Sequence, residues 1–290
     1  MVMPADQPIL DTMVGFPKKD FAIYDFIKGQ TKDSGSQEMD FPAEYMFKNV
    51  PKDLYGNEDD AVAVTIGEMD RFNIAMAMVG VNGGYGTTGF DAVKAHPDRF
   101  LPVIDLDPND IMGCTRRMDD MHAEIGVRAV SGFPSGCVPP APIDSPLWYP
   151  IYAKCVELDI PIFMCAGIPG PRLPFAPQDV ARIDQVMYDF PDLTFVTRHG
   201  CEPWQDLAVK LMLKWPGLHY STSAFAPKHY PKAIVDYANT RGAHKVIYAG
   251  YFPMGLSLDR IMGDMPHVPF KDDVWPKFLW ENAARILKVL

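Results

Sequence analysis

The stretch Leu193-Thr194-Phe195-Val196-Thr197-Arg198-His199-Gly200-Cys201-Glu202-Pro203-Trp204 decides the fold of this chain. Apolar and β-branched residues up to Val196 are typical of a buried strand, and Pro203 begins a helical pattern after a polar corner. Strand, corner and helix together form the unit of an α/β barrel, in which the carboxyl ends of the strands carry the chemistry. His199 is therefore the first candidate functional residue.

The same alternation runs through the whole chain. Strands are expected at residues 8–14, 75–81, 101–105, 127–131, 161–165, 193–198, 218–222 and 245–249. Helices are expected at residues 60–72, 146–158, 178–188, 203–215 and 231–241. Regular alternation without a break in composition predicts a parallel sheet, so residues 1–290 are expected to form a single α/β domain, a (β/α)8 TIM barrel.

Two segments fall outside the repeating pattern. Residues 16–57 are too long for a simple connection after the first strand, and we expect an insertion over the barrel mouth. A solvated surface excursion without function is the alternative. Apolar residues recur at helical spacing in residues 273–290, which predicts a closing helix at the C-terminus.

The composition limits the classes of partner. Of the 290 residues, 48% are hydrophobic and 22% charged, which is enough apolar mass for a large core. The formal charge of -10 argues against nucleic acid or an anionic membrane as a partner. The N-terminus lacks the pattern of a signal peptide, and no segment is long enough to span a bilayer. A cytoplasmic protein with reduced cysteines is the prediction, because the five cysteines are irregularly spaced.

With the strands placed, the chain resembles the amidohydrolase-related family, in the branch that contains aminocarboxymuconate-semialdehyde decarboxylase and related aromatic-acid decarboxylases. The resemblance covers nearly the whole chain and rests on the order and spacing of six fragments. These are Ile9-Leu10-Asp11, Pro146-Leu147-Trp148-Tyr149-Pro150-Ile151-Tyr152, the stretch from Arg198 to Trp204, Tyr220-Ser221-Thr222-Ser223-Ala224-Phe225, Gly242-Ala243-His244-Lys245-Val246-Ile247-Tyr248 and Glu281-Asn282-Ala283-Ala284-Arg285.

The resemblance implies a divalent metal, but the residues depart from the family pattern. The family's His-x-His pair falls on Met13 and Gly15, its fifth-strand histidine on Cys165 and its eighth-strand aspartate on Tyr251. Only His199 matches, and a catalytic zinc needs about three protein ligands. A subgroup that lost the usual ligands, with no divalent metal cofactor, is therefore the prediction. A softer site of Cys165, His199 and Cys201 is the alternative.

Residues at the strand ends are the candidates for chemistry. His199 is expected to act as general acid or base, helped by the phenol of Tyr251. Cys165 lies at the end of the neighbouring strand, where a Cys-His pair would act as nucleophile and base. Inert barrel filling is the other interpretation of Cys165. Asn82 and Asp11 end two further strands and are candidate substrate-binding residues.

Two loops add candidates for binding a carboxylate. The loop after the fifth strand is stiffened by four prolines and presents Arg172 as a bidentate clamp. A surface or subunit contact is the alternative for Arg172. The loop after the seventh strand places Ser223, Lys228 and His229 before a helix start, where anions bind favourably. A plain capping loop is the other interpretation.

The leading functional hypothesis is a metal-independent lyase of the decarboxylase type, or a hydrolase, that acts on a small aromatic or unsaturated carboxylate or acyl compound. A non-catalytic barrel that binds a ligand or a partner is the first alternative. A metal-dependent hydrolase whose ligands were not aligned is the second. The resemblance also implies a homodimer or a higher homo-oligomer.

Overall fold

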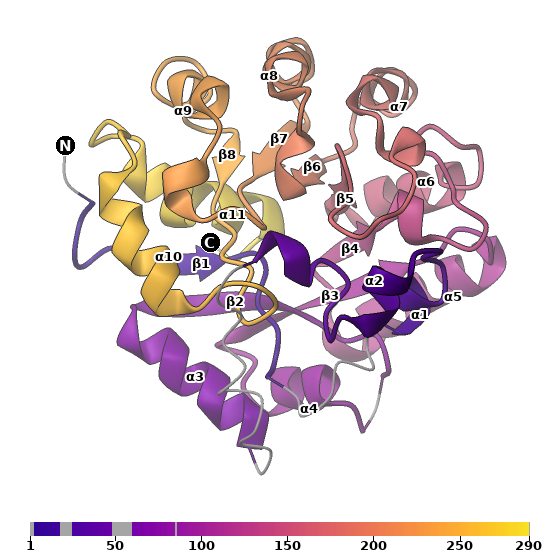
Figure 1. The fold of residues 1–290 in the computed structure, drawn as a ribbon, viewed down its shortest axis with the longest axis horizontal. Helices are drawn as coiled ribbons and strands as arrows, with labels where there is room; N and C mark the ends of the chain where they lie inside the picture. The colour runs from indigo at the N-terminus through magenta and orange to yellow at the C-terminus, as the bar shows by residue number, and fades with distance from the viewer. Residues whose placement is uncertain (1–2, 18–24, 48–59, 85, 290) are drawn as a thin grey trace.

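The computed structural model describes residues 3–17, 25–47, 60–84 and 86–289. Eight parallel strands pair in chain order, and helices surround them (Figure 1). The strands are β1 (Ile9–Asp11), β2 (Ile74–Gly80), β3 (Phe100–Leu106), β4 (Ala129–Gly132), β5 (Ile162–Cys165), β6 (Phe195–Arg198), β7 (Leu218–Ser221) and β8 (Val246–Ile247). Each strand overlaps its expected range, and the predicted (β/α)8 barrel is confirmed.

The helices connect the strands and cover the outside of the sheet. Several begin at a side-chain cap, as at Asp60, Asp110 and Ser257, whose oxygens accept backbone N–H groups of the first turn. The helices are α1 (Asp25–Lys28), α2 (Ser34–Glu38), α3 (Ala61–Arg71), α4 (Thr88–Ala95), α5 (Ile111–Ile125), α6 (Tyr149–Leu158), α7 (Ile183–Asp189), α8 (Gln205–Lys214), α9 (Lys232–Ala238), α10 (Leu258–Asp264) and α11 (Asn282–Leu287). All five helices expected from periodicity are present.

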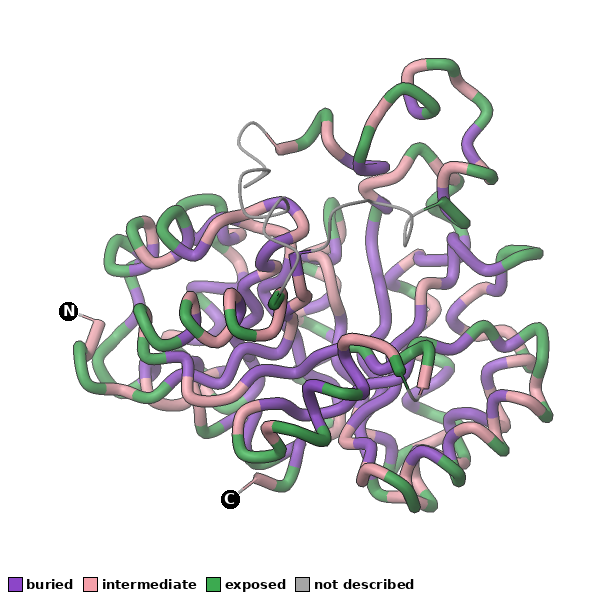
Figure 2. Tube along the Cα trace, turned by 90° about the horizontal axis from the view of Figure 1, so that it is seen from below, coloured by how far each residue is buried: buried purple, intermediate pink, exposed green. Residues whose placement is uncertain are grey.

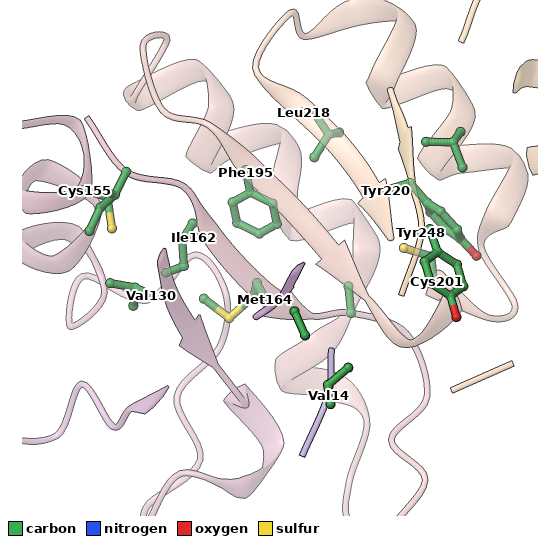
Figure 3. Packing of buried hydrophobic residues seen from close by; sticks show 14 of the residues in the cluster. Val14, Val130, Cys155, Ile162, Met164, Phe195, Cys201, Leu218, Tyr220 and Tyr248 are labelled. Carbon is green, nitrogen blue, oxygen red and sulfur yellow. The ribbon is translucent and has the colours of Figure 1, made fainter. Parts of the chain in front are cut away.

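The buried residues form two layers, one on each face of the sheet. The larger layer fills the space between strands and helices, and the buried strands are seen in Figure 2. Val130, Ile162 and Phe195 pack together in this layer (Figure 3). The smaller layer fills the barrel interior with residues from seven strands and from α11. Its members are Leu10, Met78, Leu101, Val103, Ala129, Phe163, Val196, Ile247, Ala283, Ala284, Ile286 and Leu287. The barrel is therefore a packed core rather than a channel.

The C-terminal segment closes the end of the barrel at which the strands begin. A π-helical turn, η11 (Lys277–Glu281), leads into α11. The side chain of Asn282 donates to the carbonyls of Ala243 and Val246, which lie at the start of β8. The predicted closing helix is thus present and covers the end of the barrel opposite the strand carboxyl ends.

The described part of the insertion, residues 25–47, lies over loops at the other end. Gln30 donates to the carbonyl of Gly136 after β4 at 2.9 Å. Tyr45 donates to the carbonyl of Gly170 after β5 at 2.6 Å. The rest of the expected insertion, residues 18–24 and 48–57, falls outside the described residues. Residues 25–47 thus contact the loops that follow β4 and β5.

Hydrogen bonds beyond the regular ladder join β1 to β8. Thr12 donates its N–H and its hydroxyl to the carbonyl of Tyr248, the hydroxyl at 2.8 Å. Gly15 donates to the carbonyl of Phe252 at 2.8 Å, beside a parallel bridge between Val14 and Phe252. These bonds close the barrel.

Asp11 lies in this seam. Its side chain is fully buried, and one carboxylate oxygen accepts the N–H groups of Met13 at 2.9 Å and Gly250 at 2.8 Å. Burial raises the pKa of Asp11 from the ordinary value of 3.8 to about 7, although hydrogen bonds from Gly250, Met13 and Tyr248 oppose the shift. Asp11, expected to bind substrate, lies in the barrel wall instead of facing an open mouth.

The substitution Asp11→Asn tests the seam. Between pH 4 and 7 the folded state keeps a proton that the unfolded state releases, so the free energy of unfolding falls as the pH rises. We expect this group to contribute a loss of up to about 4 kcal/mol, which Asp11→Asn removes while keeping the acceptor oxygen. Urea unfolding at several pH values measures it, with the exposed Asp120→Asn as the control. Equal pH slopes for Asp11→Asn and the wild type would contradict the assignment.

Candidate active site

Three of the strand carboxyl ends carry residues in the left-handed backbone region. His199 follows β6 with a φ of 65°, Ala224 follows β7 with 70° and Tyr251 follows β8 with 67°. Between His199 and Cys201, Gly200 has a φ of 87°, and a Cβ there would meet the ring of Phe225 at 2.3 Å. Left-handed non-glycine residues each cost about 1–3 kcal/mol and tend to gather at functional sites. The strained backbone lies where the sequence predicts the chemistry.

Ser223 holds His199 by two contacts. The hydroxyl of Ser223 accepts the N–H of His199 at 3.0 Å and lies 3.2 Å from Nδ1 of its ring. Either atom of the second contact can be the donor; when Nδ1 carries the proton and donates it to the hydroxyl, Nε2 is left as the acceptor nitrogen of the neutral imidazole. The position of the ring is therefore set from the neighbouring strand.

The surroundings of His199 favour the neutral imidazole. Burial, with a smaller contribution from the positive charge of Arg198, lowers the pKa of His199 from 6.5 to about 3. The edge of the ring meets the ring of Tyr251, with the centroids 5.3 Å apart. At neutral pH the imidazole is therefore uncharged, and any imidazolium formed there is a strong acid.

Tyr251 stands between His199 and the insertion. Its N–H donates to the carbonyl of Met13, and its ring stacks on Phe47 with the centroids 5.7 Å apart. Burial raises the pKa of Tyr251, as does the nearby Cys165, against the opposing effect of Arg198. The phenol therefore stays protonated at neutral pH and can donate a hydrogen bond.

Cys165 shares this end of the barrel and is paired in register with Arg198. Burial raises the pKa of its thiol to about 11, with Asp105 adding to the shift and Arg198 opposing it. Over the described residues no hydrogen bond joins Cys165 to His199, whose ring contacts Ser223 instead. A protonated thiol is a weak nucleophile, so the geometry gives no support to a Cys-His pair.

A polar chain crosses the barrel interior beside these residues. Arg198 donates to the hydroxyl of Ser131 at 2.6 Å and to the sulfur of Met13 at 3.0 Å. Ser131 in turn donates to one carboxylate oxygen of Asp105, and the amide of Asn82 donates to the other. Asn82, a predicted binding residue, thus belongs to a chain that ends in Arg198.

Arg198, Ser131 and Asp105 received no role from the sequence. A signal for them was present, because interior positions alternate along a strand and Arg198 follows the interior Val196 by two residues.

Two predicted binding residues lie elsewhere. Arg172 forms an ion pair with Asp33 and lies over the ring of Tyr45 at 5.0 Å, so its guanidinium is engaged by the insertion. His229 is exposed in the 3-10 turn η9 (Pro227–His229). The structure therefore brings His199, Tyr251, Cys165, Ser223 and Asn82 to the carboxyl ends of the strands, whereas Arg172 is paired within the insertion and His229 is exposed.

The described residues do not supply a conventional metal site. In the part of the chain that the structure describes, no three His, Cys, Asp or Glu side chains form a group that could hold a metal ion. Cys201 packs in the outer core near Tyr220 (Figure 3). The alternative site of Cys165, His199 and Cys201 is therefore not formed. All five cysteines are free and buried.

Comparisons with known proteins agree with the fold. A family model described as amidohydrolase matches residues 55–289. An uncharacterized TIM-barrel protein from Bordetella bronchiseptica is 23% identical, with a TM-score of 0.74 over 97% of this chain and 98% of that one. A search of curated proteins found none that matches. Among the described residues no helix has the length and apolar character to cross a membrane.

Two structures of enzymes are also similar. The 5-carboxyvanillate decarboxylase of Novosphingobium aromaticivorans, complexed with manganese and 4-hydroxy-3-methoxy-5-nitrobenzoic acid, is 15% identical, with a TM-score of 0.68 over 99% of both chains. A probable 2-pyrone-4,6-dicarboxylic acid hydrolase from Acinetobacter baumannii, with citric acid bound, is 13% identical, with a TM-score of 0.64 over 97% of this chain and 99% of that one.

The prediction that the protein has no divalent metal cofactor is wrong, because the similar structures contradict it. Several similar decarboxylases contain bound manganese, so a divalent metal is typical of them. The prediction came from counting ligands position by position along the sequence. Such counting cannot identify ligands that reach the site from other segments, and residues 48–59 lie outside the described structure.

The neutral state of His199 is open to direct measurement. Because burial and Arg198 lower its pKa to about 3, we expect its C2–H NMR resonance to stay constant between pH 8 and pH 5. Comparison with His199→Asn assigns the resonance, and the exposed His267 serves as the internal control. A titration of His199 centred near its ordinary value of 6.5 would show that the ring is not desolvated as described.

Proposed function

The chain belongs to the amidohydrolase family, and from this premise we propose that it is a carboxy-lyase or hydrolase acting on a small aromatic or unsaturated carboxylate or acyl compound. The prediction of an enzyme of one of these two types is confirmed by the family match and by the decarboxylases and the hydrolase among the similar structures. The substrate is a small molecule, and assembly into a homo-oligomer stays a prediction.

The observation that carries the proposal is the setting of His199. The ring is held by Ser223, meets the edge of Tyr251 and has its pKa lowered, all at the carboxyl end of β6. A fixed, neutral imidazole beside a protonated phenol provides a proton acceptor and a hydrogen-bond donor side by side. A surface histidine in ordinary solvent would have neither the restraint nor the shifted pKa.

These residues can serve either reaction type. In hydrolysis, His199 takes a proton from water as the water oxygen bonds to the acyl carbon, and Tyr251 donates a hydrogen bond to the oxyanion that forms. When the oxyanion collapses to the acid, the bond to the leaving group breaks and the leaving group takes the proton from the imidazolium. In decarboxylation, the bond to the carboxyl carbon breaks, its electron pair stays on the substrate carbon, and that carbon takes up a proton. His199 can accept a proton from a substrate hydroxyl and deliver it there, since its imidazolium is a strong acid.

The substitution His199→Ala tests the role. We expect turnover to fall about 10²–10⁴-fold, because that is the usual contribution of a positioned acid or base. The substrates are 2,6-dihydroxybenzoate, 5-carboxyvanillate and 2-pyrone-4,6-dicarboxylate, each assayed with manganese present. Release of CO2 and ring opening are followed separately, so the assay distinguishes a lyase from a hydrolase.

The control is His267→Ala, which changes an exposed histidine outside the mouth and should leave turnover unchanged. Unchanged turnover in His199→Ala would remove the acid-base role of that residue. Failure of the wild type to convert any aromatic carboxylate or lactone would favour the alternative of a ligand-binding barrel.

A further inference from the structure

Arg198 crosses the barrel interior. It ends β6, yet its guanidinium reaches Ser131 in β4 and Met13 just after β1. These strands are not neighbours in the sheet order, so a side chain that touches all of them lies across the bore. The guanidinium therefore occupies the middle of the mouth, directly above the apolar layer that contains Val196.

The positive charge of Arg198 lacks a direct counter-ion. Its two hydrogen-bond acceptors are a neutral hydroxyl and a thioether, and the described residues include no ion-pair partner for it. Nε is buried and has no hydrogen-bond partner in the described structure. Asp105 is linked to Arg198 only through Ser131. A poorly compensated cation inside a protein is unfavourable, so the guanidinium is prepared for an anion.

The charge of Arg198 reaches each of the candidate catalytic residues. Its charge adds to the lowering that burial gives the pKa of His199, and it opposes the rise that burial gives the pKa values of Cys165 and Tyr251. An anion bound to Arg198 therefore lies beside the proton acceptor and the phenol of the proposed reaction. Arg172, the arginine that the sequence suggested as a carboxylate clamp, is already paired with Asp33.

We propose that the Arg198 guanidinium is the substrate-binding group of this site and takes a carboxylate of a small aromatic or unsaturated acid. The inference rests on the proposed function and adds the residue that selects the substrate. A planar guanidinium matches a carboxylate through its N–H donors, and the N–H at Nε of Arg198 is used by no described acceptor. The body of the substrate then lies toward His199 and Tyr251.

Arg198 selects for charge, and that selection can be measured without knowing the substrate. The probes are 4-fluorobenzoate and its neutral analogue 4-fluorobenzamide, followed by 19F NMR titration. We expect the wild type to bind the carboxylate at least about tenfold more tightly than the amide, and Arg198→Met to lose that preference. Arg198→Lys keeps the charge without the fork and should retain only part of the preference.

Controls separate binding from folding and from catalysis. Arg260→Met removes an exposed arginine paired with Asp264 on α10 and should keep the full preference. If Arg198→Met does not fold, as judged by circular dichroism, Arg198→Lys carries the comparison.

Equal affinity of the two probes for the wild type, no binding of the carboxylate, or a full preference in both Arg198 variants would overturn the proposal. The charge preference of the wild type is measured without turnover. Full turnover in His199→Ala together with an intact preference in the wild type would therefore remove the proposed function while the anion site stands.

Discussion

The meeting of the first and last strands is the constraint on which this structure depends. An open parallel sheet would leave the edges of β1 and β8 with unpaired backbone groups, which are costly when buried. Here residues 12–15 bond to residues 248–252, and the buried carboxylate of Asp11 gathers two further N–H groups. The same bonds bring Tyr251 beside Met13, so closing the barrel also assembles one wall of the candidate site.

Above the apolar layer, the barrel interior becomes polar toward the carboxyl ends of four strands. Four strands have an apolar interior residue followed, two positions later, by a polar one. The pairs are Val103 and Asp105, Ala129 and Ser131, Phe163 and Cys165, and Val196 and Arg198. The apolar layer excludes water from below, and this strengthens the electrostatic effect of Arg198 on its neighbours. Burial above this layer is the main cause of the low pKa of His199 and of the high pKa of Cys165.

The similar decarboxylases share the scaffold of this chain, and several of them contain manganese. In the described part of this mouth, the guanidinium of Arg198 contacts Ser131 and Met13, and Ser131 links it to Asp105. The polar residues of the mouth are thus joined across the bore by one side chain.

The sequence by itself determined the eight strands, the covering helices, the closing helix and the place of His199, because periodicity and turn residues are local signals. Only the tertiary structure decided which side chains meet. Ser223 and not Cys165 holds His199, Arg172 pairs with Asp33, and Asp11 belongs to the seam. Arg198 finds Ser131 and Met13, residues 67 and 185 positions away along the chain. Alternation along β6 indicates that Arg198 faces the interior, but which residues it contacts there depends on the stagger between distant strands, which no local pattern of residues encodes.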